Sequence, residues 1–227
     1  KDIRTTIKNL SQNAVLDDIE LFEVKHLAIL AVDVAERLRN HGLDDAVAIP
    51  DLNEVITILD PDGLKMATFY VYDSYCQELR DLRSQMRQHP EQQEELLVEA
   101  AEIEEGVRRD LSKQLHPFAK ALEAAQVALA KIDLNLAKAL QMNQLGLCFP
   151  SISNNDMTHY EGMFHPQVKD ALEKTKKQFQ PVTLEFGLKP TLITGANMGG
   201  KTVVLKTLTL CQYLFQYGFG IPAQSAE

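Results

Sequence analysis

The sequence predicts a mainly α-helical domain over residues 1–145, followed by part of an α/β domain over residues 146–227. Apolar residues recur at helical spacing through most of the first range, whereas the second range alternates short apolar runs with turn residues. Of the chain's 23 Lys and Arg residues and 32 Asp and Glu residues, the first range holds 16 and 26, and the second holds 7 and 6. The two ranges therefore differ both in pattern and in charge.

The first long helix is predicted to begin at Asp17 and to end at His41-Gly42. Acidic residues in its first turn favour a helix start because they face the positive end of the helix dipole. Residues 52–59 lie between two turn signals and fit either a short helix or a strand, of which we favour the helix. The apolar positions of the long helix follow at intervals of three and four: Leu21, Val24, Leu27, Ala28, Ala31, Val34, Ala35 and Leu38.

A pair of long helices is predicted over residues 64–145. The first covers residues 64–89, Pro90 interrupts the pattern, and the second covers residues 91–145 with a break near Pro117. The acidic start of the second helix favours a solvated face or a hairpin tip over a cation or partner site. Together the two helices predict an antiparallel hairpin that acts as a lever.

The second range is predicted to contain short strands and a short helix. Strands are expected at residues 147–150 and 157–160, joined by a turn at residues 153–156. A short amphipathic helix is expected at residues 167–179, and a further strand at residues 182–186.

A glycine-rich turn is predicted to lie between a short buried strand at residues 192–194 and a helix over residues 202–217. Gly195 opens this turn, and the run Gly-Lys-Thr at residues 200–202 closes it. This is the P-loop pattern G-x-x-x-x-G-K-[ST], which binds polyphosphates. A glycine-rich turn without a ligand is the alternative, which the spacing and the flanking elements disfavour.

Each residue type in this pattern has a role in phosphate binding. Glycines let backbone N–H groups turn toward an anion because no Cβ stands in the way. The helix that follows directs the positive end of its dipole at the same anion. The ammonium of Lys201 is expected to reach the β- and γ-phosphates, and the hydroxyl of Thr202 is expected to ligate Mg²⁺.

Composition excludes several classes of protein. No apolar run approaches the roughly 20 residues of a membrane helix, so no membrane partner is expected. Cys76, Cys148 and Cys211 are too widely spaced for a metal-ligand pattern and too few for a disulfide framework, which favours a reducing cytoplasm. The net charge is −9 and the acidic excess lies in the helical range, so that range is not expected to bind a nucleic-acid backbone strongly on its own.

The interior of the glycine-rich turn resembles the P-loop of the MutS family of DNA-repair ATPases. A general P-loop pattern does not specify the run Asn-Met-Gly-Gly found at residues 197–200. Residues 161–168 also resemble that family's Gly-x-x-His-Pro segment, and residues 220–224 are similar to its Val-Pro-Ala-Gln segment. The resemblance is specific over residues 130–227, whereas over residues 1–129 it is limited to helical architecture.

The resemblance implies an ABC-type α/β P-loop NTPase fold, present here in part, after a helical core and lever domain. It implies that ATP or ADP and Mg²⁺ bind, with Thr202 at the metal. It also implies that Phe179 stacks on the adenine base, with ordinary core packing as the alternative. His165, which precedes Pro166, is expected to fix a loop, and no catalytic residue is assigned. The implied nucleotide-binding residues of the loop are Gly195, Ala196, Asn197, Met198, Gly199, Gly200, Lys201 and Thr202.

For partners, the resemblance implies a homodimer and the binding of mismatched or branched DNA through a longer protein. Ala196 and the run Thr202-Val203-Val204 depart from the mismatch-repair members and are similar to the recombination-related bacterial branch, which lacks the clamp domain. The family's Walker B strand, signature loop and catalytic glutamate have no counterpart after Thr202. We therefore expect part of a longer ATPase, with ATP hydrolysis by this part alone near background. The alternative is a helical scaffold with an incomplete, non-hydrolysing nucleotide site.

Overall fold

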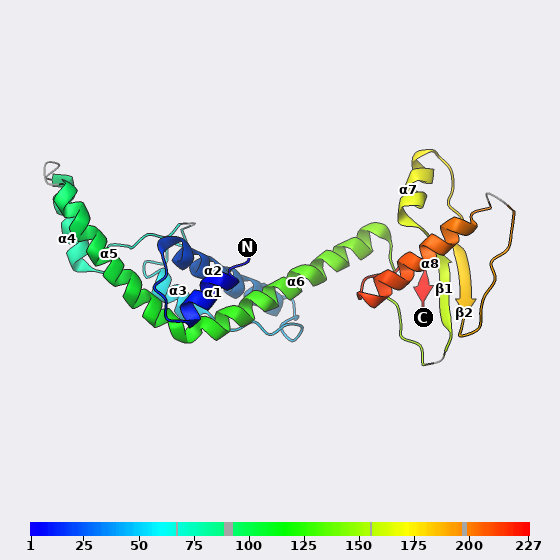
Figure 1. Cartoon of the computed structure of the whole chain (residues 1–227), viewed down its shortest axis with the longest axis horizontal. Helices are drawn as coiled ribbons and strands as arrows, with labels where there is room; N and C mark the ends of the chain where they lie inside the picture. Colours follow the sequence, from blue (N-terminus) through cyan, green and yellow to red (C-terminus); the bar gives the residue numbers. More distant parts are fainter. Residues whose placement is uncertain (67, 89–92, 155, 197–198) are drawn as a thin grey trace. The chain divides into compact units, whose positions relative to one another are not determined.

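The computed structural model describes residues 1–66, 68–88, 93–154, 156–196 and 199–227 (Figure 1). The chain divides into two compact units, Lys1–Asp133 and Leu134–Glu227, and each is described by itself. The division falls inside helix α6 (Ala119–Leu145). The domain boundary expected after residue 145, where α6 ends, stays a prediction.

Unit 1 is a helical assembly around an apolar core. In it α1 (Arg4–Ser11), α2 (Asp18–Asn40) and α3 (Asn53–Leu59) pack with α5 (Gln93–Leu115) and the start of α6. Burial of apolar side chains drives this packing, at roughly 25 cal/mol per Å². Each of these elements contributes at least one fully buried side chain: Leu10, Leu21, Val24, Leu59, Leu115 and Leu122.

Helix α2 begins where the sequence predicts it. Asp17 is the N-cap residue, and its Oδ1 accepts a hydrogen bond from the backbone N–H of Glu20 at 2.8 Å. In return, the backbone N–H of Asp17 donates to Oε2 of Glu20 at 3.1 Å. This capping box satisfies two N–H groups that a helix start otherwise leaves unpaired. The structure confirms the predicted long helix, and α3 confirms the helix favoured for residues 52–59.

Replacing Asp17 with alanine is expected to lower the free energy of unfolding by about 1 kcal/mol, because the backbone N–H of Glu20 loses its acceptor. Chemical denaturation followed by circular dichroism measures this difference. Asp44→Ala is the matched control, since Asp44 is exposed and lies outside the helices. Equal stability of Asp17→Ala and the parent chain would contradict the role of the cap.

The helix predicted over residues 64–89 is wrong in its first half. Helix α4 spans only Gln77–Gln88, and the described residues between 64 and 76 form no helix. Instead Phe69, Tyr72 and Tyr75 form an aromatic cluster against the core of unit 1, with ring centroids 5.6 to 6.5 Å apart. Packing of these rings outweighs the local helical pattern of the sequence.

A buried ion pair fixes this segment to α2. The side chains of Lys25 and Asp60 are 1% and 2% exposed. Lys25 Nζ donates to Oδ1 of Asp60 and to the hydroxyl of Tyr72, both at 3.0 Å. Oδ2 of Asp60 accepts from the backbone N–H of Lys65 at 2.8 Å. Burial opposes the charged carboxylate, but the hydrogen bonds from Lys65 and Lys25 prevail and lower the pKa of Asp60 below its usual value.

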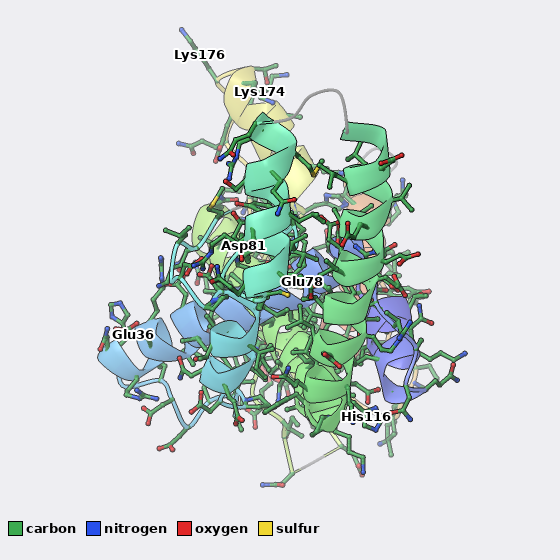
Figure 2. The ribbon with its side chains drawn as sticks, turned by 90° about the vertical axis from the view of Figure 1, so that its left-hand side faces the viewer. Glu36, Glu78, Asp81, His116, Lys174 and Lys176 are labelled. Atoms are coloured by element: carbon green, nitrogen blue, oxygen red, sulfur yellow. The ribbon has the colours of Figure 1, made fainter. Side chains whose placement is uncertain are left out.

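Helices α4 and α5 lie side by side as a hairpin, as both views of the chain show (Figures 1 and 2). Arg83 of α4 joins them, since its guanidinium donates to Glu104 of α5 at 2.7 Å and also to the carboxylate of Asp73. The hairpin expected over residues 64–145 is therefore corrected to a shorter one, because α4 has only 12 residues. Pro90, predicted to interrupt the pattern, lies outside the described residues.

Helix α5 ends at the break predicted near Pro117. A 3₁₀ turn, η2 (His116–Phe118), separates it from α6, because proline removes a backbone donor from the helix. Nδ1 of His116 lies 2.9 Å from the carbonyl oxygen of Leu10, which ties the turn to α1. Each helix in the described part of the chain is too short or too polar to cross a membrane.

Unit 2 contains a small antiparallel sheet, with α8 (Lys201–Gln216) crossing one face (Figure 1). The strands β1 (Thr158–Met163), β2 (Val182–Phe186) and β3 (Ser225–Ala226) are arranged in the order β2-β1-β3. Helix and sheet bury a common apolar cluster: Tyr160, Met163, Cys211, Ile221, Ala223 and Ala226. The sheet is small, and the α/β P-loop fold stays a prediction.

Several predicted elements of this unit differ from the structure. The strand at residues 182–186 is confirmed, and α7 (Pro166–Lys174) is shorter than the helix expected at residues 167–179. The strand expected at residues 147–150 is wrong, since only Cys148 pairs there, in an isolated bridge with Ile221. The strand expected at 157–160 is β1, which pairs with β2 and β3 because these later segments supply its neighbours.

The short strand expected at residues 192–194 is also absent from the described part of the chain. These residues form no strand, and the side chain of Leu192 is 85% exposed. A strand needs a neighbour to pair its backbone N–H and C=O groups, and no described segment pairs with this one. The helix expected to follow the glycine-rich turn is confirmed by α8.

The cysteine thiols are free, and their burial differs. Cys76 of unit 1 and Cys148 of unit 2 are partly buried, whereas Cys211 on α8 is completely buried. Burial opposes the charged thiolate and raises the pKa of Cys211 to about 12. The Cys211 thiol is therefore part of the core of unit 2.

Candidate phosphate-binding loop

The glycine-rich turn enters α8 through Gly200. This residue is the N-cap and has a φ of 85°, in the left-handed region that glycine adopts at low cost. Immediately before it, the N–H of Gly199 donates to the carbonyl of Ala196 at 3.1 Å, and a Cβ on Gly199 would stand 3.0 Å from that oxygen. No side chain among the described residues caps α8, so its first N–H groups remain open to an anion.

Lys201 begins the helix and folds back over the turn. Its Nζ donates to the carbonyl oxygens of Gly195 and Ala196, both at 2.6 Å. Hydrogen bonds from a charged donor are short and strong, so the loop holds the ammonium close to the N-terminus of α8. Positive charge and open N–H groups are thereby brought to one place, which is the chemistry that a phosphate group requires.

The structure brings the described residues of the predicted loop together. Gly195 and Ala196 lie in an exposed segment, Gly199 and Gly200 form the turn, and Lys201 and Thr202 are the first two residues of α8. Asn197 and Met198 lie outside the described residues. The binding roles of all these residues stay predictions.

Phe179 lies in the segment between α7 and β2 and is partly buried. It lines a cavity of about 540 Å³ together with Gly199 and Gly200. Val203 and Val204, in the first turn of α8, line the same cavity and were not assigned to nucleotide binding from the sequence. Their only signal was their place next to Lys201 and Thr202. An apolar cavity beside open N–H groups can hold a ring and a phosphate on one ligand.

Hydrogen bonds and buried side chains anchor α8 to the sheet behind this site. The amide Nε2 of Gln212 donates to the hydroxyl of Tyr160 in β1 at 2.8 Å. Tyr160 is 3% exposed, and its burial raises the pKa of the phenol to about 12. The neutral phenol therefore remains a hydrogen-bond partner across the physiological pH range, and α8 is fixed relative to β1.

A divalent ion at this site would depend on few protein ligands. The described part of the chain contains no group of three or more His, Cys, Asp or Glu side chains placed to hold a metal. Thr202 is exposed at the start of α8, where its hydroxyl is available. An exposed hydroxyl at this place fits Mg²⁺, which commonly takes one or two protein ligands and completes its shell with phosphate oxygens and water.

Sequence comparison finds similar proteins that carry one name. No family model matches the chain. A protein of Caldicellulosiruptor bescii named endonuclease MutS2 is 26% identical over 231 residues, which cover 100% of this chain and 27% of that protein. A protein of Exiguobacterium sibiricum with the same name is 34% identical over 133 residues, which cover 58% of this chain and 16% of that protein.

A third protein named endonuclease MutS2, from Caldicellulosiruptor saccharolyticus, is 28% identical over 173 residues, 75% of this chain and 20% of that protein. The chain thus spans about a quarter or less of the length of these relatives. The resemblance inferred from the glycine-rich turn is confirmed by relatives that match along the chain. The chain is thus similar to the MutS2 branch of the MutS family.

Proposed function

We propose that the chain is the ATP-binding part of a MutS-like ATPase that acts on DNA. The observation that carries this proposal is the position of Lys201, whose Nζ is held by the carbonyls of Gly195 and Ala196 beside the uncapped N-terminus of α8. Polyphosphates bind where backbone N–H groups, a helix dipole and an ammonium converge.

Each part of the site has a role in this proposal. The N–H groups at the turn and in the first turn of α8 bind phosphate oxygens, and Lys201 neutralises their charge. Mg²⁺, when bound, supplies further positive charge and is held by the hydroxyl of Thr202. Phe179 and the cavity that it lines exclude water from the adenine base.

Coupling between the nucleotide and the lever belongs to the same proposal. In the second half of α6, Nζ of Lys138 donates to the carbonyl of Tyr217 at 3.2 Å and lies 4.6 Å from the ring centroid of Phe219. Tyr217 and Phe219 directly follow α8, so a movement of α8 on nucleotide binding is passed to α6.

The partners of the whole protein are proposed from the resemblance and from the relatives' name. We propose a homodimer that binds mismatched or branched DNA through regions of a longer protein. The acidic charge of residues 1–145 supports this assignment, because that range does not favour a phosphate backbone. The free cysteines support location in a reducing cytoplasm.

Isothermal titration of the chain with ATP, ADP and adenosine in Mg²⁺ tests the proposal. ATP and ADP are expected to bind, and adenosine is expected to bind at least about 100-fold more weakly, because charge-assisted hydrogen bonds to the phosphates supply most of the affinity. Equal affinity for ADP and adenosine would contradict phosphate recognition. Absence of binding by ATP and ADP would favour the helical scaffold with an incomplete site.

A further inference from the structure

The first turn of α8 has hollows on two sides. The larger is the cavity of about 540 Å³ that contains Phe179 and Gly199. The second, of about 480 Å³, is lined by Thr202 and Lys206 of α8 and by His165, which lies just before α7. From the sequence, His165 is expected only to fix a loop, and it has no role in the proposed function.

The backbone of His165 is fixed by its place at the start of α7. It is the N-cap residue, in an extended conformation with φ −91° and ψ 112°, and Pro166 follows as the first helical residue. Its carbonyl accepts from the N–H of Lys169 at 2.9 Å. These constraints fix the backbone position from which His165 lines the second hollow.

The imidazole of His165 has one nitrogen that the fold leaves unused. Nδ1 is inaccessible to solvent and has no hydrogen-bond partner among the described residues. A buried N–H without an acceptor is more costly than a buried lone pair without a donor, which favours the tautomer with its hydrogen on Nε2. In that tautomer Nε2 is the hydrogen-bond donor of the ring, and Lys206 lines the same hollow.

Each hollow has lining residues in or next to the loop proposed to bind phosphate. Gly199 and Gly200 line the first, and Thr202, two residues later, lines the second. A nucleotide with its base in the first hollow and its phosphates over the start of α8 directs its last phosphate toward the second. The groups that would meet it there are an N–H donor, an ammonium and a hydroxyl.

We propose that His165 and Lys206 bind the terminal phosphate of a nucleoside triphosphate and so distinguish it from a diphosphate. The proposal rests on the proposed function, because it takes the phosphates to lie at Lys201, with the terminal one also contacted from the second hollow. In this proposal His165 contacts phosphate, whereas the sequence predicts only a structural role for it.

Titration calorimetry with ADP and with the non-hydrolysable β,γ-imido analogue of ATP, both in Mg²⁺, tests this assignment. His165→Leu is expected to weaken the triphosphate analogue about ten-fold or more, because a hydrogen bond to a charged acceptor is lost, and to leave ADP within about two-fold. Lys206→Met is expected to act in the same direction. His165→Gln is expected to retain most of the affinity, since its amide nitrogen can take the position of Nε2.

Thr209→Val is the matched control, because Thr209 lines the far part of the same hollow and its hydroxyl already donates to the carbonyl of Leu205 at 2.9 Å. A His165→Leu chain that loses ADP and the triphosphate equally, or that loses neither, overturns the inference. A parent chain that binds no nucleotide overturns the proposed function itself, and the two failures are thus distinct. Thermal melts of each variant by circular dichroism establish that unit 2 remains folded.

Discussion

Lys201→Ala is expected to weaken the binding of ATP about 100-fold. The ammonium lies where the phosphates would bind, as its 2.6 Å hydrogen bonds to Gly195 and Ala196 indicate. A hydrogen bond that involves a charged group contributes about 1.5–3 kcal/mol, so the loss of two to phosphate oxygens costs about 3 kcal/mol. That free energy corresponds to a change in Kd of about 100-fold. Titration calorimetry with ATP in Mg²⁺ measures it.

The matched control for this variant is Lys174→Ala. Lys174 lies at the end of α7, is exposed and pairs with Asp170 at 2.7 Å, so its removal changes the net charge equally without touching the loop. ATP affinity is expected to change less than two-fold in this control, since exposed charges are largely screened by salt. If Lys201→Ala binds ATP as tightly as the parent chain, the assignment of the phosphate site is wrong.

Lys25→Ala is expected to lower the free energy of unfolding of unit 1 by about 3–5 kcal/mol. It removes the cation from a pair in which both side chains are almost completely buried, and so leaves the charge of Asp60 without its partner. It also removes a donor to the hydroxyl of Tyr72. The expected decrease in Tm is about 10 °C or more. Urea denaturation followed by circular dichroism measures the change.

The double variant Lys25→Met/Asp60→Leu is expected to recover most of this stability, because apolar groups of similar volume avoid the cost of burying charge.

The lowered pKa of Asp60 determines the pH range over which its charged form stabilises unit 1. The stability contributed by its charged form is complete above the pKa of an unfolded aspartate, about 3.9, and is lost as the pH falls through the lower folded value. Lys113→Ala, at an exposed position of α5, is the control. A Lys25→Ala chain as stable as the Lys113→Ala chain would contradict the importance of the ion pair between Lys25 and Asp60.

Elements defined by local signals were predicted well. Helix α2 has its capping residues and its apolar period in one stretch of sequence, and α8 follows a glycine-rich turn whose spacing is diagnostic. The break at Pro117 follows from the chemistry of proline alone. In each case, residues within a few positions of one another determine the conformation.

Elements determined by distant partners were not predicted. Residues 64–76 have a helical pattern, but contacts with Lys25 and Asp60 hold them against the core. The residues around Lys25 in the sequence do not indicate that this lysine is buried. The strand expected at residues 192–194 depends on neighbours that the described chain does not supply. Sequence patterns report local preference, whereas pairing and burial depend on the rest of the fold.

The candidate site also has one part that the sequence predicted and one part that it did not. The P-loop spacing at residues 195–202 named Lys201 and Thr202 because that motif is local and specific. The hollow that joins Thr202 to His165 could not be predicted, since the two residues are 37 positions apart and meet only after α7 and α8 have formed. The orphaned Nδ1 of His165 is likewise visible only in three dimensions.

The buried thiol of Cys211 can be used to measure how often unit 2 opens. Thiol reagents attack the thiolate, and Cys211 is inaccessible with a pKa near 12, so its labelling must wait for the cluster beneath α8 to separate. Cys76, partly exposed in unit 1, serves as an internal reference for the reagent. Slower labelling of Cys211 than of Cys76 reports, without denaturant, how seldom unit 2 opens. Because Cys211 and Lys201 share one helix, a ligand at the loop would slow the labelling of Cys211 by the extent to which it holds that helix in place.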